Sequence, residues 1–387
     1  MQIGYMTTLA QPPDIDYARL LDELREQAVL CDQGGFEHIW LAEHHFGTDG
    51  HDNSPNPFML AADVGARTER IRLGIAVVVL PLWHPLRAAE NITLLDQMFR
   101  GRIAEIGFGR ASRPHEVTSF NLDANPRNVE RSRELFQECI EIVRKACTEK
   151  YFEHIGEYYR IPPENTPWTT AKGIEPDPEW VRDGRIYRLG VVPKPYQTPH
   201  PAFSMACSSD STVEFCASLG LRAMAWRQPP LMLKQWIERY AKAMEASGHP
   251  VAVPAANWSV LRNIYVAPTM EEARRDYEPA VIGETRYRAA DPWRALQAYR
   301  NPGEELAPGT ELDWDFLQNR SVIAGSPDHV AEQLAELEST TGVQTVLASV
   351  GTRGVPHRKL MRCLELMSER VIPQLQGSPA AEAGALQ

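Results

Sequence analysis

The 387-residue sequence lacks the features of several large protein classes. No apolar run approaches the roughly 20 residues that span a bilayer, and the first residues, MQIGYMTTLA, lack the basic start of a signal peptide. Positive charge is also in deficit, because 40 Lys and Arg face 51 Asp and Glu, a net charge of −11. This balance argues against broad nucleic-acid binding and against anionic membrane surfaces. We therefore expect a cytoplasmic protein with neither a nucleic acid nor a membrane as its partner.

Cysteine is scarce and scattered. The sequence contains no Cys-X-X-Cys pair, the spacing typical of zinc and redox sites, and its six cysteines are Cys31, Cys139, Cys147, Cys207, Cys216 and Cys363. In a reducing compartment we expect buried thiols rather than disulfides. A chain of this length can bury a large apolar core without such cross-links.

Short apolar segments alternate with amphipathic ones along most of the chain. IRLGIAVVVL (71–80) is almost entirely apolar, which suits a strand buried on both faces of a parallel sheet. Residues 14–33 place Leu20, Leu24 and Cys31 on one face, which predicts a helix. Eight such strand–helix units are predicted, with strands at 2–9, 36–42, 71–80, 102–109, 201–207, 221–226, 259–267 and 343–349. They favour an α/β fold, the (β/α)8 TIM barrel, over a doubly wound sheet, because no glycine-rich turn follows the first strand.

Two long segments interrupt this alternation. Residues 150–200 are rich in Pro, Trp and Tyr, and residues 283–325 are similar in composition. Long loops in a compact barrel are often functional lids, and they matter most at the C-terminal ends of the strands. We therefore predict one barrel domain over 1–376, with both insertions on that face as candidate lids. The tail, 377–387, is predicted to be disordered.

A histidine pair follows the second predicted strand. His44 and His45 stand in AEHHF (42–46), at a strand end where a barrel carries its reactive groups. Histidine can give or take a proton near neutral pH, so His44 is a candidate acid–base residue. Two other interpretations stay open: ordinary loop histidines, and a metal-dependent hydrolase that uses His44, His45 and Asp49. We expect no metal, because the spacing matches no standard ligand pair.

Two turns could bind an anion. The turn 107–110, Gly-Phe-Gly-Arg, follows the fourth predicted strand, and its Arg110 can fork onto a phosphate. Ser208, Ser209 and Thr212 open the helix after the fifth strand, where free N–H groups favour an anion. Ordinary turn and cap chemistry explains each turn equally well when it is taken alone. A barrel places both turns at neighbouring strand ends, so together they predict a phosphate site.

These residues together resemble the bacterial luciferase-like family of flavin-dependent monooxygenases, which are (β/α)8 barrels. The order and spacing match over most of residues 1–375, whereas the two insertions match poorly. The segments that carry the resemblance are AEHHF (42–46), LGIAVVVLPLWHP (73–85), RAAENITLLDQMFRGRIAEIGFGR (87–110), SSDSTVEFCASLG (208–220) and AGSPDHVAEQL (324–334). The joint pattern is specific, although each segment alone is not.

The resemblance implies a role for each matching position. His44 matches the histidine beside the reactive side of the flavin, where it handles protons. Ala76 and Val77 match a non-proline cis peptide that presses against the isoalloxazine ring, and Trp226 matches a tryptophan near the flavin. The implied FMN-binding residues are Ala76, Val77, Arg110, Ser208, Ser209, Thr212 and Trp226. No metal is implied.

The activity implied by the resemblance is that of the oxygenase of a two-component monooxygenase. A separate NAD(P)H:flavin reductase would supply reduced FMN, and dioxygen would be activated as a flavin hydroperoxide for hydroxylation or Baeyer–Villiger oxidation. The substrate would be a mid-sized organic molecule, free or carrier-bound, of the kind found in secondary metabolism. Light emission is not expected, because Ser208 stands where luciferases have a glutamate. The family commonly dimerises, so a homodimer is expected.

Two alternatives keep the barrel and change its use. A deazaflavin in place of FMN would give a hydride-transfer oxidoreductase that needs no dioxygen. A non-catalytic flavin-binding protein would need His44 for flavin affinity alone.

Overall fold

The computed structural model describes residues 1–10, 16–47, 50–52, 54–110, 113–169, 175–288, 296–318 and 320–376. Contacts divide the chain into two compact units. Unit 1 contains Met1–Val77 and Phe203–Gln387, and unit 2 contains Val78–Ala202. The predicted tail, 377–387, lies outside the described residues, and the single domain over 1–376 stays a prediction.

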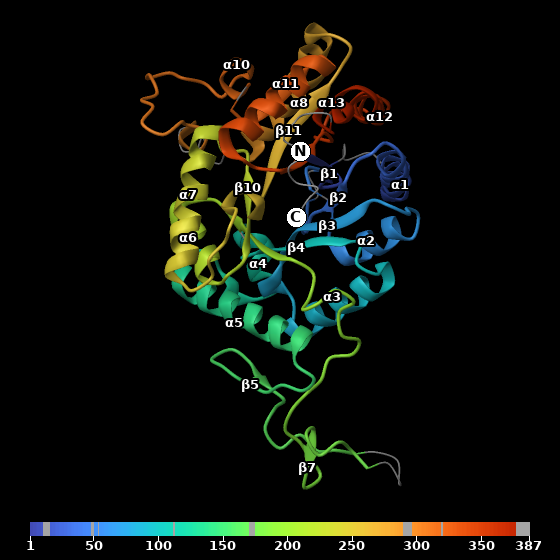
Figure 1. Cartoon of the computed structure of the whole chain (residues 1–387), viewed down its shortest axis with the longest axis vertical. Coiled ribbons are helices and arrows are strands. Elements are labelled where there is room, and N and C mark those ends of the chain that lie inside the picture. The colour runs from blue at the N-terminus through green and yellow to red at the C-terminus, as the bar shows by residue number, and fades with distance from the viewer. Residues whose placement is uncertain are drawn as a thin grey trace. The chain divides into compact units, whose positions relative to one another are not determined.

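The main sheet is parallel and closes into a barrel (Figure 1). Its order is β10-β9-β4-β3-β2-β1-β13-β11, and β10 also pairs with β11, which joins the two ends. All eight predicted strands are present, so the predicted (β/α)8 barrel is confirmed. The barrel strands are β1 (Gln2–Thr7), β2 (His38–Leu41), β3 (Arg72–Val79), β4 (Ile103–Gly109), β9 (Phe203–Cys207), β10 (Arg222–Trp226), β11 (Trp258–Val266) and β13 (Thr345–Ser349).

One strand was not predicted. β12 (Val322–Gly325) pairs in parallel with the second half of β11, from Asn263 to Val266. β10 pairs only with the first half of β11, from Trp258 to Leu261. β11 therefore extends beyond β10, and β12 takes over as its neighbour. The short apolar run VIAG lies in a stretch that composition alone assigned to an irregular insertion.

Helices cover the strands of unit 1, and their ends follow local sequence rules. The Asp16 side chain accepts from the backbone N–H of Ala18 and caps the first helix, and Asn56 caps the second, which begins at Pro57. The helices are α1 (Tyr17–Gln33), α2 (Pro57–Gly65), α6 (Asp210–Ser218), α7 (Pro230–Ala246), α8 (Met270–Arg288), α10 (Trp314–Leu317), α11 (Pro327–Thr341), α12 (His357–Leu366) and α13 (Ile372–Gln376). Among the described helices, none has the length and apolar character needed to cross a membrane.

An apolar cluster from six strands and the turn after β2 forms the heart of unit 1. Its buried members are Met6, Trp40, Ala42, Ala76, Met224, Leu261 and Leu347, with Val77 and Trp226 partly buried against it. The Trp40 indole is 1% exposed, and a Cβ at Gly74 would collide with its ring. Glycine at position 74 therefore allows β3 to pack directly against this indole. Burial of one such side chain is worth roughly 1.5–3 kcal/mol.

The described part of unit 2 contains β4, three α-helices and two small hairpins. The helices are α3 (Pro85–Phe99), α4 (Pro114–Thr118) and α5 (Val129–Thr148), and α3 packs on α5. Pro85 occupies the first turn of α3, where a missing N–H costs nothing. The hairpins pair β5 (His154–Ile155) with β6 (Arg160–Ile161), and β7 (Val181–Arg182) with β8 (Arg185–Ile186).

The insertion at 150–200 is ordered in its described part and packs on the outer helices of unit 2. Glu138 of α5 accepts from the His154 ring at 3.0 Å and from the backbone N–H of Tyr158. The returning chain donates from Gln197 Nε2 to the carbonyl of Ile103, at 2.9 Å. Ile103 is the first residue of β4, so this contact marks the N-terminal end of the strand.

The position predicted for this insertion, on the C-terminal face of the strands, stays a prediction. Its return contacts the N-terminal end of β4, whereas the Tyr159 ring lies 5.4 Å from the His84 ring, at the start of α3. The order of connection explains the contact with β4. The insertion follows α5 and precedes β9, and in a barrel the helix-to-strand connections lie at the N-terminal ends of the strands.

The insertion at 283–325 contains more regular structure than predicted. It begins inside α8, which continues to Arg288, and it includes α10 and β12. Residues 289–295 and 319 lie outside the described part of the chain. Arg320 forms a double contact with the Glu304 carboxylate, at 2.6 Å from each oxygen, and this pair ties the later part of the insertion together.

Candidate active site

His44 lies in the turn between β2 and α2, at the C-terminal end of β2. Its backbone N–H donates to the carbonyl of Ser54 at 2.9 Å, and the Ser54 hydroxyl donates to the carbonyl of Thr8 at 3.4 Å. These bonds anchor the turn to the end of β1. The His44 side chain keeps 22% of its surface exposed, so its ring is held in place and still accessible.

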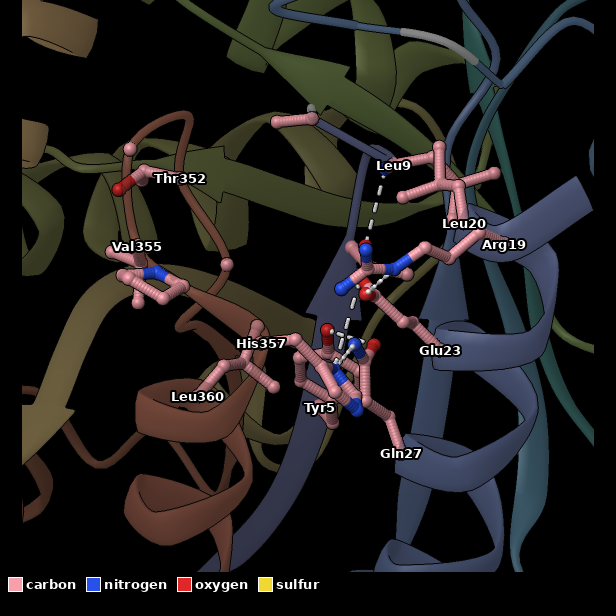
Figure 2. A pocket seen from close by; sticks show the side chains of 15 residues that line it. Tyr5, Leu9, Arg19, Leu20, Glu23, Gln27, Thr352, Val355, His357 and Leu360 are labelled. Carbon is pink, nitrogen blue, oxygen red and sulfur yellow. Dashed lines mark hydrogen bonds and ion pairs between the residues drawn. The ribbon is translucent and has the colours of Figure 1, made fainter. Parts of the chain in front are cut away.

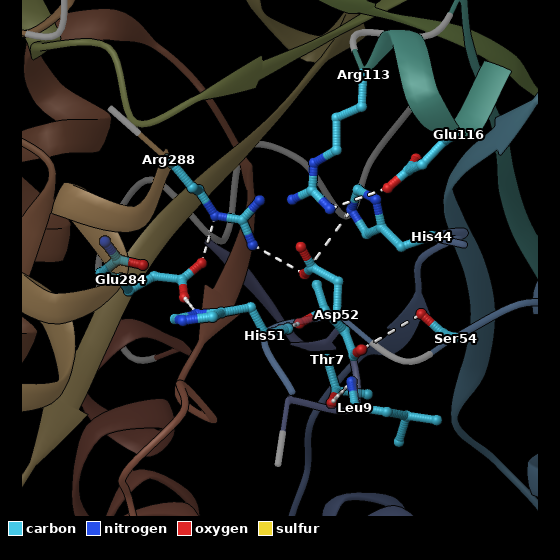
Figure 3. Close-up of polar contacts among 12 residues, drawn as sticks. Thr7, Leu9, His44, His51, Asp52, Ser54, Arg113, Glu116, Glu284 and Arg288 are labelled. Atoms are coloured by element: carbon cyan, nitrogen blue, oxygen red, sulfur yellow. Dashed lines mark hydrogen bonds and ion pairs between the residues drawn. The ribbon is translucent and has the colours of Figure 1, made fainter. Parts of the chain in front are cut away.

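A buried carboxylate faces the His44 ring. The nearest Asp52 oxygen is 3.9 Å from His44 Nε2, and the Asp52 side chain is fully buried. The same oxygen accepts from the Arg288 guanidinium at 2.9 Å (Figure 3). A buried carboxylate is costly unless it is paired, so Arg288 keeps Asp52 charged beside the histidine.

The network of ion pairs extends from Arg288 through Glu284 to His51, the residue that precedes Asp52 (Figure 3). Arg288 also pairs with Glu284, one turn earlier on α8, and Glu284 binds His51 Nδ1 at 2.9 Å. Arg353 lies 3.2 Å from His51 Nε2. A guanidinium can only donate, so His51 Nε2 accepts from Arg353 and Nδ1 donates to Glu284. The network therefore balances two arginines against two carboxylates.

The two adjacent histidines have different surroundings. His45 Nε2 lies 2.9 Å from the Glu43 carboxylate, and Glu43 is 2% exposed. The His45 ring is thus bonded to a buried partner from its own turn, whereas His44 faces Asp52 at a longer distance. This difference supports the prediction from the sequence that His44, rather than His45, is the candidate for proton transfer.

Metal ligation finds no support in the described part of the chain. Within those residues, no group of three or more His, Cys, Asp or Glu side chains is placed to hold a metal ion. Asp49, the third ligand of the metal-dependent alternative, lies outside the described residues.

The Ala76–Val77 peptide bond is cis, as the resemblance implied. Leu41 of β2 pairs with Ile75 of β3, so this peptide bond lies level with the start of the turn that carries His44. Ala76 is buried in the apolar cluster of unit 1, and Val77 and Trp226 pack against that cluster with part of their surface exposed. These three predicted residues thus share one partly open apolar surface.

The three predicted hydroxyl residues lie at the start of α6, where Ser209 and Thr212 form the cap. Ser209 is the N-cap, and the Thr212 hydroxyl accepts from the backbone N–H groups of Ser208 and Ser209, each at 2.9 Å. Thr212 is 8% exposed, whereas Ser208 and Ser209 are exposed. Thr212 therefore shapes the turn, and the two serines present their hydroxyl groups at the positive end of a nine-residue helix.

Arg110 follows β4 and belongs to unit 2. Its guanidinium donates to the carbonyl of Val129 at 3.2 Å, at the start of α5. Burial lowers the pKa of Arg110, and the nearby charge of Arg133 lowers it further. The contact between Arg110 and a phosphate stays a prediction.

A separate cavity of about 280 Å³ lies between α1 and α12 in unit 1 (Figure 2). Its polar groups bind one another: the Tyr5 hydroxyl donates to Gln27 at 2.8 Å, and Gln27 Nε2 lies 3.2 Å from His357 Nδ1. Arg19 pairs with Glu23 at 3.0 Å. Because these groups already have partners within the cavity lining, we place the chemistry at the His44 turn instead.

Comparison with known proteins agrees with this geometry. The model of the luciferase-like monooxygenase family matches residues 1–344. The chain belongs to this family. The predicted enzyme class, a flavin-dependent monooxygenase, is confirmed by this membership.

Three similar proteins illustrate the family. The alkanal monooxygenase alpha chain of Photorhabdus laumondii is 26% identical over 97% of this chain and 98% of its own length. The oxygenase component of a flavin-dependent trigonelline monooxygenase from Acinetobacter baylyi is 27% identical over 66% of this chain and 62% of its own. The oxygenating constituent of 3,6-diketocamphane monooxygenase from Pseudomonas putida, solved with FMN, superposes with a TM-score of 0.78 at 22% identity, covering 97% and 98% of the two chains.

Several residues of this site escaped the sequence prediction. Asp52, Glu284 and Arg288 reach the His44 turn, and Glu284 is separated from His51 by 233 positions. Such pairing leaves no local pattern in one sequence. The only available hint was Asp52 itself, an acidic residue close to a candidate catalytic histidine.

Proposed function

We propose that this protein is the oxygenase of a two-component system, which receives reduced FMN from a separate NAD(P)H:flavin reductase. It would insert one atom of dioxygen into a mid-sized organic substrate and release the other as water. The observation that carries this proposal is the accessible His44 ring beside buried Asp52, level with the partly open surface of Ala76, Val77 and Trp226.

The residues present fit FMN. A phosphate needs hydrogen-bond donors and positive potential, and the exposed Ser208 and Ser209 hydroxyls at the start of α6 offer both. A flat ring system needs an apolar surface, which Val77 and Trp226 provide. We assign Arg110 and Thr212 to the same phosphate site, with Thr212 holding the turn in shape.

Each group of residues would have a distinct task. Bound reduced FMN would supply the electrons that activate dioxygen. His44 would hold or move a proton through Nε2, and Asp52 would stabilise the protonated ring. Arg288 and Glu284 would fix Asp52 and bring the end of α8 against the His44 turn. Exclusion of water by such packing favours oxygen transfer over loss of peroxide.

The remaining assignments extend the same proposal. The oxygenase component of the trigonelline enzyme supports a partner reductase, and the alkanal and diketocamphane enzymes support an organic substrate. Hydroxylation and Baeyer–Villiger insertion both use this arrangement. We further propose a cytoplasmic homodimer.

The test measures flavin binding and the fate of dioxygen separately. The purified protein is titrated with FMN, then supplied with reduced FMN, isotopically labelled dioxygen and a set of candidate organic substrates. We expect one labelled oxygen atom in an organic product. If the protein binds flavin and yields no labelled product with any of the candidate substrates, the non-catalytic alternative replaces this proposal.

A further inference from the structure

Arg227 lies where β10 ends and β12 begins to accompany β11. Its backbone is left-handed, with a φ of 52°, a conformation that non-glycine residues rarely adopt. Its N–H donates to the carbonyl of Leu261 at 3.2 Å, and its Nε donates to Asn263 Oδ1 at 3.1 Å. The side chain is thus held at a definite place, and the residue is half-buried.

The partner of Arg227 shows which side of β11 it occupies. Asn263 lies two positions after Leu261, and residues two apart on a strand point to the same face. Leu261 belongs to the apolar cluster that contains Ala76 and borders Trp226. Asn263 and the Arg227 guanidinium therefore lie on this inner face, one step nearer the C-terminal end of the strands.

A second arginine fixes the turn from the outer face. Arg262, next to Asn263, is 1% exposed and donates to the carbonyls of Leu261 and Gln228, at 2.9 and 2.7 Å. These two bonds tie the chain after β10 to β11. These bonds explain why Arg262 is buried. Because Arg262 already holds the turn after β10, the Arg227 guanidinium is not needed for that purpose.

Arg227 has no anionic partner among the described residues. The two buried carboxylates of the network around the His44 turn, Asp52 and Glu284, both pair with Arg288. In the described part of the chain, no carboxylate lies within ion-pairing distance of Arg227, and Asn263 Nδ2 is a buried donor with no acceptor. A half-buried cation beside an unsatisfied donor is suited to an anion from outside the chain.

We propose that Arg227 binds the N1–C2=O edge of the isoalloxazine of reduced FMN. This inference rests on the proposed function, which places the ring on the surface of Val77 and Trp226. Oxidised isoalloxazine is neutral, whereas the two-electron-reduced ring loses its N1 proton near neutral pH and spreads the negative charge over N1 and O2. A guanidinium presents two parallel N–H groups to such an edge, and Asn263 Nδ2 offers a further donor. Arg227 therefore favours binding of the reduced cofactor over the oxidised one.

The test compares the two oxidation states of one cofactor. The full-length protein and its Arg227→Gln and Arg227→Lys variants are titrated anaerobically with FMN and with dithionite-reduced FMN. A lost charge-assisted bond weakens binding of reduced FMN by about tenfold or more, while oxidised FMN binds as before. A tenfold loss of affinity for reduced FMN alone lowers the midpoint potential of the bound flavin by about 30 mV. Arg227→Lys retains the charge and most of the preference.

A matched control removes a positive charge elsewhere in unit 1. Arg274 on α8 is largely exposed and pairs with Glu278, so Arg274→Gln should leave both affinities unchanged. Equal weakening of both flavin states by Arg227→Gln would show a structural role only and overturn the inference, as would no change in either. If the unsubstituted protein binds neither state of FMN, both the proposed function and this inference fail.

Discussion

The two insertions of this protein have similar composition and opposite relations to the chemistry. Residues 150–200 pack on α3 and α5 within unit 2, and their return contacts the start of β4. Residues 283–325 begin inside α8, whose Glu284 and Arg288 bind the His51 and Asp52 side chains of the His44 turn. The order of connection explains the contrast. The first insertion precedes a strand, and the second begins in the helix that follows one.

This contrast shows that composition is a poor guide to the task of an insertion. Both segments are long and rich in aromatic residues, and the sequence predicts both as candidate lids on the same face of the barrel. In the first insertion the aromatics contact one another: the Trp168 and Trp180 rings lie 4.5 Å apart, and Tyr151 stacks on Trp180 at 6.3 Å. They hold the insertion together and need no substrate to cover them.

The largest effect is expected when one histidine is removed from the turn that α8 contacts and another from the first insertion. His44→Ala should lower product formation about 100-fold or more, because a positioned proton-transfer group is lost, and should leave flavin affinity intact. His154→Gln in the first insertion should leave product formation unchanged. Product and peroxide are measured per reduced FMN consumed. Equal losses in the two variants would remove the functional distinction between the insertions.

A second test removes an arginine from each insertion. Arg288→Met leaves Asp52 without its cation, so we expect a loss of about 1–3 kcal/mol in the free energy of unfolding, together with slower turnover. Arg160→Met breaks an exposed pair with Glu164, 2.9 Å long, which should cost about 0–1 kcal/mol and leave turnover unchanged. Denaturant unfolding and steady-state rates supply both readouts. Unchanged turnover in the Arg288 variant would show that these ion pairs stabilise the fold and do not contribute to the reaction.

The barrel was predictable from the sequence, and the network around His44 was not. Each strand is a local apolar run, such as Ile71–Leu80, and local patterns survive in a single sequence. The ionic network joins residues separated by 233 to 302 positions, from Glu284 to His51 and from Arg353 to His51. Nothing local encodes such pairs. The contact of residues 150–200 with the start of β4 was predictable, because the predicted element order places them in a helix-to-strand connection.

A third test weakens the first insertion from within. Trp180→Ala removes the ring that contacts both Trp168 and Tyr151, and we expect a local loss of about 1–3 kcal/mol, detected as faster hydrogen exchange over residues 150–169. Product yield and peroxide release should not change. Trp180→Phe keeps an aromatic ring and should exchange more slowly than the alanine variant. A rise in peroxide release would instead support this insertion as a lid.

The smallest expected difference between the insertions is in how much stability each loses as the pH falls. In the second insertion, the Arg320 hydrogen bond lowers the pKa of Glu304 from 4.5 to about 2, against a smaller opposing effect of burial. Because the pKa of Glu304 is lower in the folded than in the unfolded protein, its ion pair stabilises the folded state at pH values above 4.5, the pKa in the unfolded chain. This stabilisation is lost as the pH falls toward 2. Glu304→Gln should therefore reduce stability at pH 7 and flatten its decline over that window.

In the first insertion, Asp177 offers the matched control, because its bond to the exposed side chain of Lys150 lowers the pKa of a half-buried carboxylate. Solvent screens this pair, so Asp177→Asn should change the acid profile less than Glu304→Gln does. Hydrogen exchange measured from pH 7 down to about 3 reads each insertion separately, because protection is reported segment by segment. A larger change in the acid profile for Asp177→Asn than for Glu304→Gln would contradict this expectation. It would mean that ion pairs stabilise the first insertion more than the second.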